Sequence, residues 1–187
     1  MCSDELEKHV AAYQGALIDN GVTGSSIAGV FTKSQTLALS TVSSDIAGDR
    51  SITEDTIFPI WSMSKPITIV AMMILLDRNA YKLDDPVKKY IPYFDELKCK
   101  SPNASEGTYI CQNDLLIEHL LAHRSGYSYK NVPNFRDPFL NLDEFVRHVA
   151  SYPVDFEPGS AYLYGINQAI LGRLIEILSE KEFYLFL

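Results

Sequence analysis

The segment from residue 61 to residue 76 constrains the fold of this chain more than any other part of the sequence. Ser62 and Lys65 stand three residues apart, and ten uncharged, mostly apolar residues (67–76) follow Pro66. Residues three apart share one face of a helix, so a helix that begins near Ser62 brings the serine hydroxyl and the lysine amine together. Pro66 fits the first turn, where backbone N–H groups have no partner inside the helix. The helix therefore starts with a nucleophile beside a base.

This pair of residues has a catalytic and an ordinary interpretation. A lysine can activate a serine hydroxyl by removing its proton, once apolar surroundings lower the lysine pKa. The ordinary interpretation is a helix cap followed by a solvated lysine, because this spacing arises by chance in roughly half of chains of this length. Two features favour catalysis: Ser62 is the only serine with a lysine three residues later, and the following helix is apolar on every side. Such a helix is usually buried, which places Lys65 at the mouth of a core.

The charge balance excludes one broad class of partner. The chain of 187 residues has a net charge of −8 and a pI near 4.9, and it contains no basic cluster. Proteins that bind nucleic acid offer positive charge to the phosphates, so we expect no nucleic-acid partner. The apolar run 67–76 is too short to span a bilayer, and no signal peptide opens the chain. We therefore expect a soluble protein without a membrane span, in a compartment that the sequence leaves open.

Cys99 and Cys111 flank a polar, turn-rich stretch that we interpret as a surface loop. A disulfide could close this loop in an oxidising compartment, and Asn103 begins a glycosylation sequon within it. Without a signal peptide, two free cysteines are the favoured prediction.

The apolar periodicity of the remaining chain predicts helices and strands together. The first helix has a predicted apolar face of Leu6, Val10, Tyr13 and Leu17. Two predicted strands, at residues 25–31 and 37–42, then form a hairpin. Four later segments are predicted to be helices. The first holds Ile117 and Leu120, and the second is capped by Asn141 and Glu144 and ended by Pro153. The third covers residues 170–178, and the fourth starts at Lys181 after a Ser179–Glu182 capping pattern.

The order of these signals resembles the serine β-lactamase and penicillin-binding-protein superfamily, nearest its class C β-lactamase-like branch, which includes esterases and D-amino-acid peptidases. The similarity begins near residue 25 and runs to the last residue. The resemblance implies an α+β, β-lactamase/transpeptidase-like fold in a single incomplete domain, residues 1–187. Residues 1–57 would supply the N-terminal helix and two strands, and residues 58–187 the helical region with the active-site motifs. The similarity is clearest in four segments: 58–68, 82–87, 119–126 and 156–160.

The resemblance also implies a set of site residues. The acylated serine and lysine of the first family motif correspond to Ser62 and Lys65, and the tyrosine of the second motif, whose phenol shares in moving the proton, corresponds to Tyr164. Ile166 occupies the position of the usual asparagine, which counts against β-lactam hydrolysis and favours an esterase or peptidase. For Asn167, one residue later, we favour helix capping over substrate binding.

His123 is a tempting base, but its segment is a structural helix end in the family, so we place it outside the site. The implied activity is a serine hydrolase that forms an acyl-enzyme with a small ester, amide or peptide substrate, without metal or cofactor. The third family motif, Lys or His followed by x-Gly, has no counterpart here, and the C-terminal sheet strands are missing. We therefore expect a truncated domain that is a weak catalyst alone and self-associates through the exposed sheet edge. The alternative is a non-catalytic scaffold or interaction module with the same fold.

Overall fold

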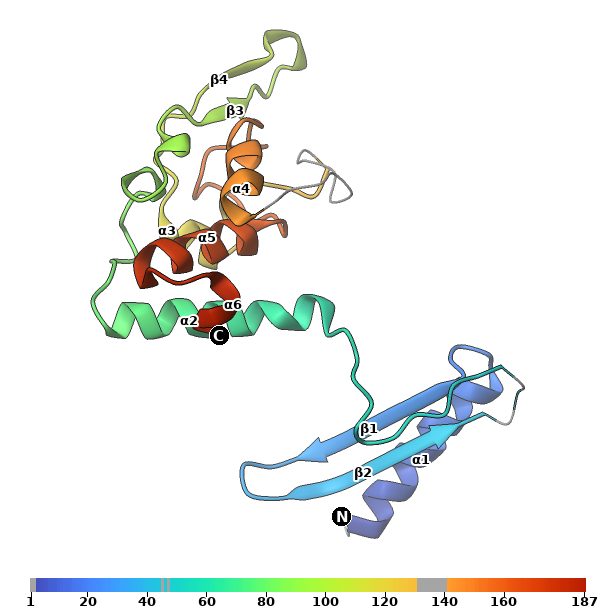
Figure 1. Ribbon diagram of the computed structural model, residues 1–187. Coiled ribbons are helices and arrows are strands. Elements are labelled where there is room, and N and C mark those ends of the chain that lie inside the picture. The colour runs from blue at the N-terminus through green and yellow to red at the C-terminus, as the bar shows by residue number, and fades with distance from the viewer. Residues whose placement is uncertain (1–2, 45, 47, 131–140) are drawn as a thin grey trace. The chain divides into compact units, whose positions relative to one another are not determined.

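A computed structural model describes residues 3–44, 46, 48–130 and 141–187 of the chain. These residues fall into two compact units, Met1–Pro59 and Ile60–Leu187, and each unit is described by itself (Figure 1). No helix among the described residues combines the length and the apolar character needed to cross a membrane.

The first unit is one helix packed on a β-hairpin. Helix α1 (Ser3–Asp19) lies against strands β1 (Ser25–Phe31) and β2 (Thr36–Ser43). The two strands pair antiparallel, with Ser25 opposite Ser43, so the predicted hairpin is confirmed.

The predicted apolar face of α1 is wrong at Tyr13, whose side chain is 67% exposed. Its neighbour Gln14 is buried instead. The Gln14 amide donates to the carbonyl oxygens of Ser26, at 3.0 Å, and Ser40, at 3.1 Å. A buried amide needs such partners, and here they come from both strands, so Gln14 ties the helix to the whole hairpin.

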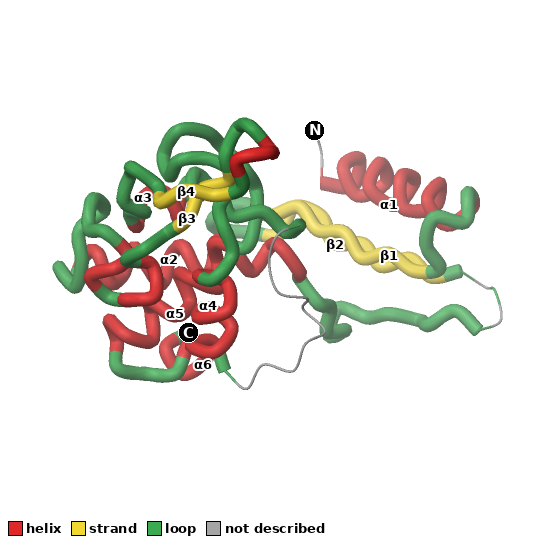
Figure 2. Tube along the Cα trace, turned by 90° about the horizontal axis from the view of Figure 1, so that it is seen from above, coloured by secondary structure: helices red, strands yellow, loops and turns green. Residues whose placement is uncertain are grey.

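The second unit is mostly helical, with α5 at its centre. Helix α5 contacts α2, α3, α4 and α6, and Figure 2 shows the helices gathered on one side of the short strands β3 and β4. The predicted helices near residues 117, 142 and 170 are confirmed. The bounds are η1 (Trp61–Ser64), α2 (Lys65–Asp77), η2 (Val87–Lys89), η3 (Pro92–Phe94), β3 (Lys98–Lys100), η4 (Ala104–Glu106), β4 (Thr108–Ile110), α3 (Ile117–Leu121), α4 (Leu142–Ala150), α5 (Asn167–Ser179) and α6 (Phe183–Phe186).

The core of this unit follows from the spacing of apolar residues on α5. Ile170, Leu171, Leu174 and Ile175 recur at helical spacing and are fully buried. They belong to a cluster with Met72 of α2 and with side chains from α3 and α4. Because apolar burial contributes about 25 cal/mol per Å², this cluster is the main source of stability for the unit.

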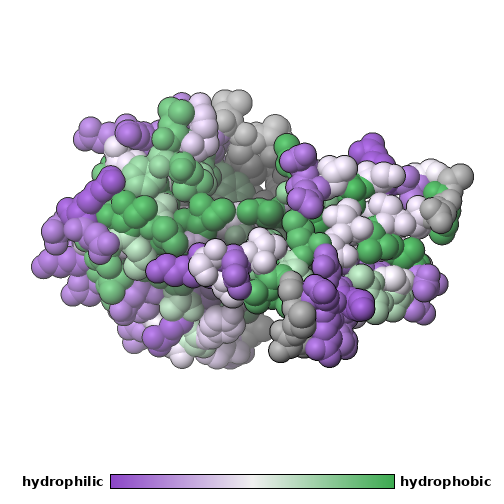
Figure 3. All heavy atoms as spheres, turned by 90° about the horizontal axis from the view of Figure 1, so that it is seen from below, coloured by the Kyte–Doolittle hydropathy of each residue, from purple (hydrophilic) through white to green (hydrophobic). Residues whose placement is uncertain are grey.

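Helix α2 is less buried than its composition predicts. Its inner face buries Thr68, Ala71, Met72 and Leu75. The opposite face exposes apolar side chains, so the prediction of a helix buried on every side is wrong. Figure 3 shows a band of hydrophobic side chains across the underside of the second unit, where α2 lies in Figure 1. The exposed residues of α2 are Ile67, Val70 and Ile74.

Cys99 and Cys111 form a disulfide, so the prediction of two free cysteines is wrong. Cys99 lies in β3 and Cys111 directly follows β4, which pairs antiparallel with β3. The hairpin brings the two ends of the loop together, and sequence spacing alone does not reveal this pairing. The bridge therefore closes the loop over residues 99–111.

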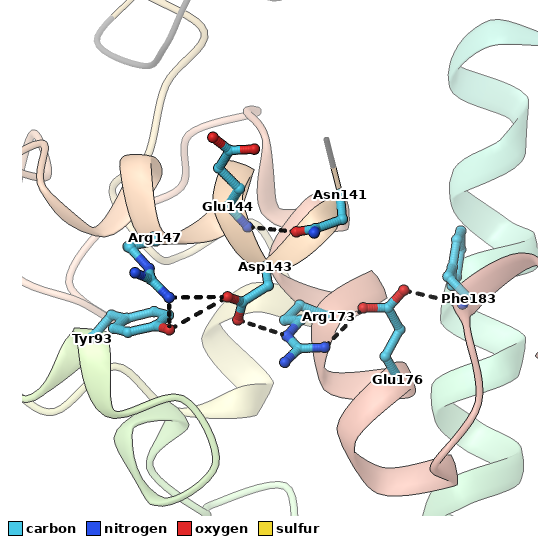
Figure 4. Close-up of polar contacts among 8 residues, drawn as sticks. All are labelled: Tyr93, Asn141, Asp143, Glu144, Arg147, Arg173, Glu176 and Phe183. Carbon is cyan, nitrogen blue, oxygen red and sulfur yellow. Dashed lines mark hydrogen bonds and ion pairs between the residues drawn. The ribbon is translucent and has the colours of Figure 1, made fainter. Parts of the chain in front are cut away.

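The predicted cap of α4 is confirmed, because the Asn141 side chain accepts a hydrogen bond from the Glu144 N–H at 2.9 Å. Beyond this cap, Asp143 joins Arg147 of α4 and Arg173 of α5, as Figure 4 shows. The predicted start of the last helix at Lys181 is wrong, since α6 starts at Phe183. Its first N–H donates to a carboxylate of α5, so polar contacts link α4, α5 and α6.

Candidate active site

Ser62 and Lys65 meet at the start of the α2 helix. Ser62 lies in the η1 turn, and α2 continues directly from it at Lys65, with Pro66 in the first helical turn. The Lys65 Nζ lies 2.9 Å from the Ser62 Oγ and donates a hydrogen bond to it. Ser62 is exposed, so its hydroxyl is open to a reactant from solvent.

Tyr164 reaches the same point from a segment about a hundred residues later in the chain. The Lys65 Nζ lies 4.9 Å from the centre of the Tyr164 ring. Hydrogen bonding to Lys65 first, and then to Ser62, lowers the pKa of the Tyr164 phenol below its ordinary value of 10.0. A phenol with a lowered pKa is a better general base near neutral pH, because more of it is ionised.

The pKa of Lys65 shifts in the opposite direction to that of Tyr164. Burial lowers the pKa of Lys65, but hydrogen bonds to Tyr164 and Tyr129 outweigh burial, so the net shift is upward. The expectation that apolar surroundings lower this pKa is therefore wrong. The reason is that burial, although it is the largest single effect, is outweighed by the hydrogen bonds and charge interactions of two phenols, which favour the charged form of the ammonium. The interaction between the two side chains thus favours the charged form of Lys65 and the ionised form of Tyr164.

Tyr129 is a member of this group that the sequence does not reveal. Its ring centre lies 5.9 Å from that of Tyr164, and its hydroxyl interacts with Lys65. A lone tyrosine outside a recognised motif most often packs as an ordinary aromatic residue. Only the approach of two loops in the folded chain shows that Tyr129 and Tyr164 both interact with Lys65.

His123 also lies beside the site, although the sequence analysis places it outside. Its ring centre is 4.7 Å from that of Tyr164, with an angle of 33° between the ring planes. Burial, and then the charge of Lys65, lower the pKa of His123 below its ordinary value of 6.5. Both effects disfavour the charged imidazolium form of His123 beside Tyr164.

Asn167 does not cap helix α5, and its side chain lies inside the unit. Helix α5 begins at Asn167, its N-cap is Ile166, and no side-chain cap bond is present there, so the capping prediction is wrong. The Asn167 side chain is fully buried. Its oxygen accepts a hydrogen bond from the Ser125 hydroxyl, and its amide nitrogen lies 2.7 Å from the His123 Nδ1. Asn167 therefore connects Ser125 to the His123 ring by hydrogen bonds.

Gly165 explains how the two loops come so close. A Cβ atom at position 165 would lie 1.9 Å from the Tyr127 carbonyl oxygen, which is far inside van der Waals contact. Only glycine permits this approach. The contact joins the loop that carries His123 and Tyr129 to the loop that carries Tyr164.

One group of possible metal ligands occurs in the described part of the chain: Cys99, Cys111 and Glu157. The two sulfurs are joined to each other, and Glu157 accepts hydrogen bonds from the N–H groups of Gln112 and Asn113. These donor atoms are already satisfied, so the group does not fit a metal ion.

Comparison with known proteins gives one family. The sequence model of the Beta-lactamase family matches residues 6–185. Esterase EstB of Burkholderia gladioli is 31% identical over 147 residues, which are 71% of this chain and 35% of EstB. Teichoic acid D-alanine hydrolase of Staphylococcus aureus is 28% identical over 133 residues, or 70% of this chain and 29% of that protein.

A solved structure shares the fold. EstCE1, described as a hydrolase with promiscuous acyltransferase activity, superposes with a TM-score of 0.82 at 22% identity, over 98% of this chain and 50% of EstCE1. The chain thus spans half of that structure and about a third of the curated relatives. The predicted β-lactamase/transpeptidase-like fold is confirmed. A match over residues 6–185 covers nearly the whole chain, and the protein therefore belongs to the Beta-lactamase family.

Proposed function

We propose that Ser62, Lys65 and Tyr164 form the acylation site of a serine hydrolase that acts on an ester or amide. The observation that carries this proposal is the 2.9 Å hydrogen bond between Lys65 and Ser62, with the phenol of Tyr164 interacting with both. A nucleophile, a fixed cation and a base of lowered pKa are the groups that acyl transfer needs.

The proton balance assigns a role to each group. The Ser62 oxygen forms a bond to the substrate carbonyl carbon while its proton passes to the ionised Tyr164. When the tetrahedral intermediate collapses, the bond to the alcohol or amine breaks, and Tyr164 returns the proton to that leaving group. Water then attacks the acyl-enzyme by the same route, which releases the acid and restores Ser62. Lys65 stays charged throughout and stabilises the phenolate.

The relatives support this class of reaction. EstB is named as an esterase, the Staphylococcus aureus relative as a teichoic acid D-alanine hydrolase, and EstCE1 as a hydrolase with promiscuous acyltransferase activity. The identities are low, so they support the reaction class and leave the substrate open.

A fluorophosphonate probe tests the proposal directly, because it labels only an activated serine. We expect the probe to modify Ser62, as located by peptide mass spectrometry, and Ser62→Ala to lose the label. Ser64→Ala is a matched control, since Ser64 lies two residues away and donates to the Trp61 carbonyl oxygen instead. If the wild-type chain takes no label at Ser62 even when it is mixed with the C-terminal half of a full-length relative, the hydrolase proposal is wrong and the scaffold alternative gains support.

A further inference from the structure

We propose that His123 is a positioning residue that clamps Tyr164 in the orientation needed for catalysis, an inference that rests on the proposed function of Tyr164. Three separate contacts between His123 and the segment 163–165 support it.

The first two contacts hold the backbone on both sides of Tyr164. The Leu163 N–H donates to the His123 carbonyl oxygen at 2.8 Å. The Gly165 N–H donates to the His123 Nδ1 at 3.5 Å. His123 therefore binds the residue before Tyr164 through its main chain and the residue after it through its ring.

The third contact is with Tyr164 itself. The imidazole lies against the phenol ring, with centres 4.7 Å apart. Tyr162 approaches the imidazole edge-on, with ring centres 6.1 Å apart and an angle of 69° between the planes. Packed aromatic rings limit each other's rotation, so the Tyr164 hydroxyl keeps its direction toward Lys65.

The hydrogen bonds also define the tautomer of His123. A backbone N–H can only donate, so the Nδ1 that faces Gly165 must accept, and the ring proton sits on Nε2. The Asn167 amide nitrogen donates to the same Nδ1. The Asn167 orientation is defined in turn, because its oxygen accepts from Ser125, whose own oxygen accepts from the Tyr127 N–H at 3.1 Å. Each donor in this series of hydrogen bonds therefore has an acceptor.

The backbone conformation of His123 also helps to direct it toward the segment 163–165. His123 has a positive φ of 54°, a region that few residues with side chains adopt. This conformation directs both the carbonyl oxygen and the ring of His123 to the segment 163–165. The clamp therefore depends on the histidine side chain and on the turn that carries it.

Protonation would release the clamp. A proton on Nδ1 would face two other donors, the Gly165 N–H and the Asn167 amide. The titratable groups that face His123 are Lys65 on α2, and Tyr162 and Tyr164 on the adjacent loop. Among these groups the positive charge of Lys65 opposes an imidazolium, because it lowers the pKa of His123. The hydrogen bonds that His123 accepts are therefore formed at neutral pH. They are lost as the pH falls below 6.5, the ordinary pKa of histidine.

The test follows the Tyr164 phenol by NMR in the full chain with ¹³C-labelled tyrosine, using Tyr164→Phe to assign the signal. His123→Phe keeps a ring against Tyr164 but removes the acceptor. We expect the Tyr164 pKa to rise toward that of a free tyrosine and the labelling of Ser62 to slow about 100-fold, which is the usual effect of misplacing a catalytic group by 1 Å. His119→Gln is the control, because His119 is a buried histidine on α3 that bonds the Leu116 N–H and should leave both readouts unchanged.

Two further outcomes decide the proposal. An unchanged Tyr164 titration in a folded His123→Phe variant would overturn it, whatever happens to Ser62 labelling. If that variant does not fold, ¹⁵N NMR of the wild-type imidazole decides: a proton on Nε2 supports the clamp, and a proton on Nδ1 overturns it. Both NMR readouts are independent of hydrolysis. If Ser62 takes no label in the labelling test described above, the proposed function fails. The two NMR readouts would still test the His123 clamp.

Discussion

The Lys65 ammonium lies 4.9 Å from the centre of the Tyr164 ring, and the two groups shift each other's pKa in opposite directions. The lysine favours the phenolate, and the phenols favour the ammonium, as opposite charges do at short range. Under the proposed function, this coupling gives Lys65 the role of a permanent charge and Tyr164 the role of proton carrier.

The first prediction concerns Lys65→Met, which removes the charge but keeps a flexible apolar chain. We expect the Tyr164 pKa to rise, because its main stabilising partner is gone, and labelling of Ser62 to slow by about 100- to 10,000-fold. Lys65→Arg is the control, since it keeps the charge and should preserve most of the Tyr164 shift. Equal Tyr164 titrations in Lys65→Met and wild type would contradict the coupling.

The second prediction is a pH profile. If ionised Tyr164 is the base, the labelling rate of Ser62 rises with pH as the phenol ionises and levels off below pH 10, the ordinary value for tyrosine. Tyr164→Phe should be slow at every pH and lose this rise. A profile that keeps its shape in Tyr164→Phe would assign the base to another group.

The third prediction concerns stability and Asp85. This carboxylate accepts hydrogen bonds from the Tyr90 hydroxyl at 2.6 Å and the Lys82 N–H at 2.8 Å, and it pairs with Lys89. The Tyr90 bond, followed by the Lys82 bond, lowers the Asp85 pKa from 3.8 to about 2.

A carboxylate with a lowered folded-state pKa stabilises the protein above its unfolded pKa, and this stability is lost as the pH falls toward 2. We expect Asp85→Asn to lower the free energy of unfolding by about 1 to 2 kcal/mol at pH 7, measured by urea denaturation. The difference from wild type should shrink steadily below pH 4. A constant difference down to pH 2 would show that packing, not charge, explains the loss.

The fourth prediction is that the Cys99–Cys111 disulfide stabilises the second unit. For a loop of this length, removing the cross-link should lower the free energy of unfolding by about 3 kcal/mol. Cys99→Ser with Cys111→Ser tests this by chemical denaturation. Reducing agent should destabilise the wild type and leave the double variant unchanged.

The fifth prediction is that Gly165→Ala disrupts the site more than the fold. The added methyl group would overlap the Tyr127 carbonyl oxygen, so the two loops must separate. We expect the Tyr164 pKa to rise and labelling to fall about 100-fold, while far-UV circular dichroism stays the same. Gly15→Ala in α1 is the control, because nothing lies within 4 Å of a Cβ at that position. Wild-type labelling in Gly165→Ala would show that the contact is dispensable.

The sequence predicts the features that depend on local spacing. The 25–31 strand, the Asn141 cap and the meeting of Ser62 with Lys65 each follow from residues a few positions apart. The family resemblance adds Tyr164, which spacing alone cannot connect to Lys65.

Features that depend on the approach of distant segments are beyond such reasoning. Tyr129 and His123 gain their roles only because Gly165 lets two loops touch. The pKa of Lys65 was predicted in the wrong direction because tertiary packing brings two phenols to it. The inward position of Gln14 in place of Tyr13 also depends on tertiary packing.

The contact between Gly165 and Tyr127 also divides the candidate site into a helical part and a loop part. Ser62 and Lys65 stay together on one continuous helical segment whenever α2 is formed. Tyr129 and Tyr164 reach them only while the loops remain joined, and loops open more often than core helices. In each brief opening the nucleophile keeps its cation but loses its base. Catalytic competence would then report how long the two loops stay closed, and hydrogen exchange at the Gly165 amide would measure that lifetime independently of any substrate.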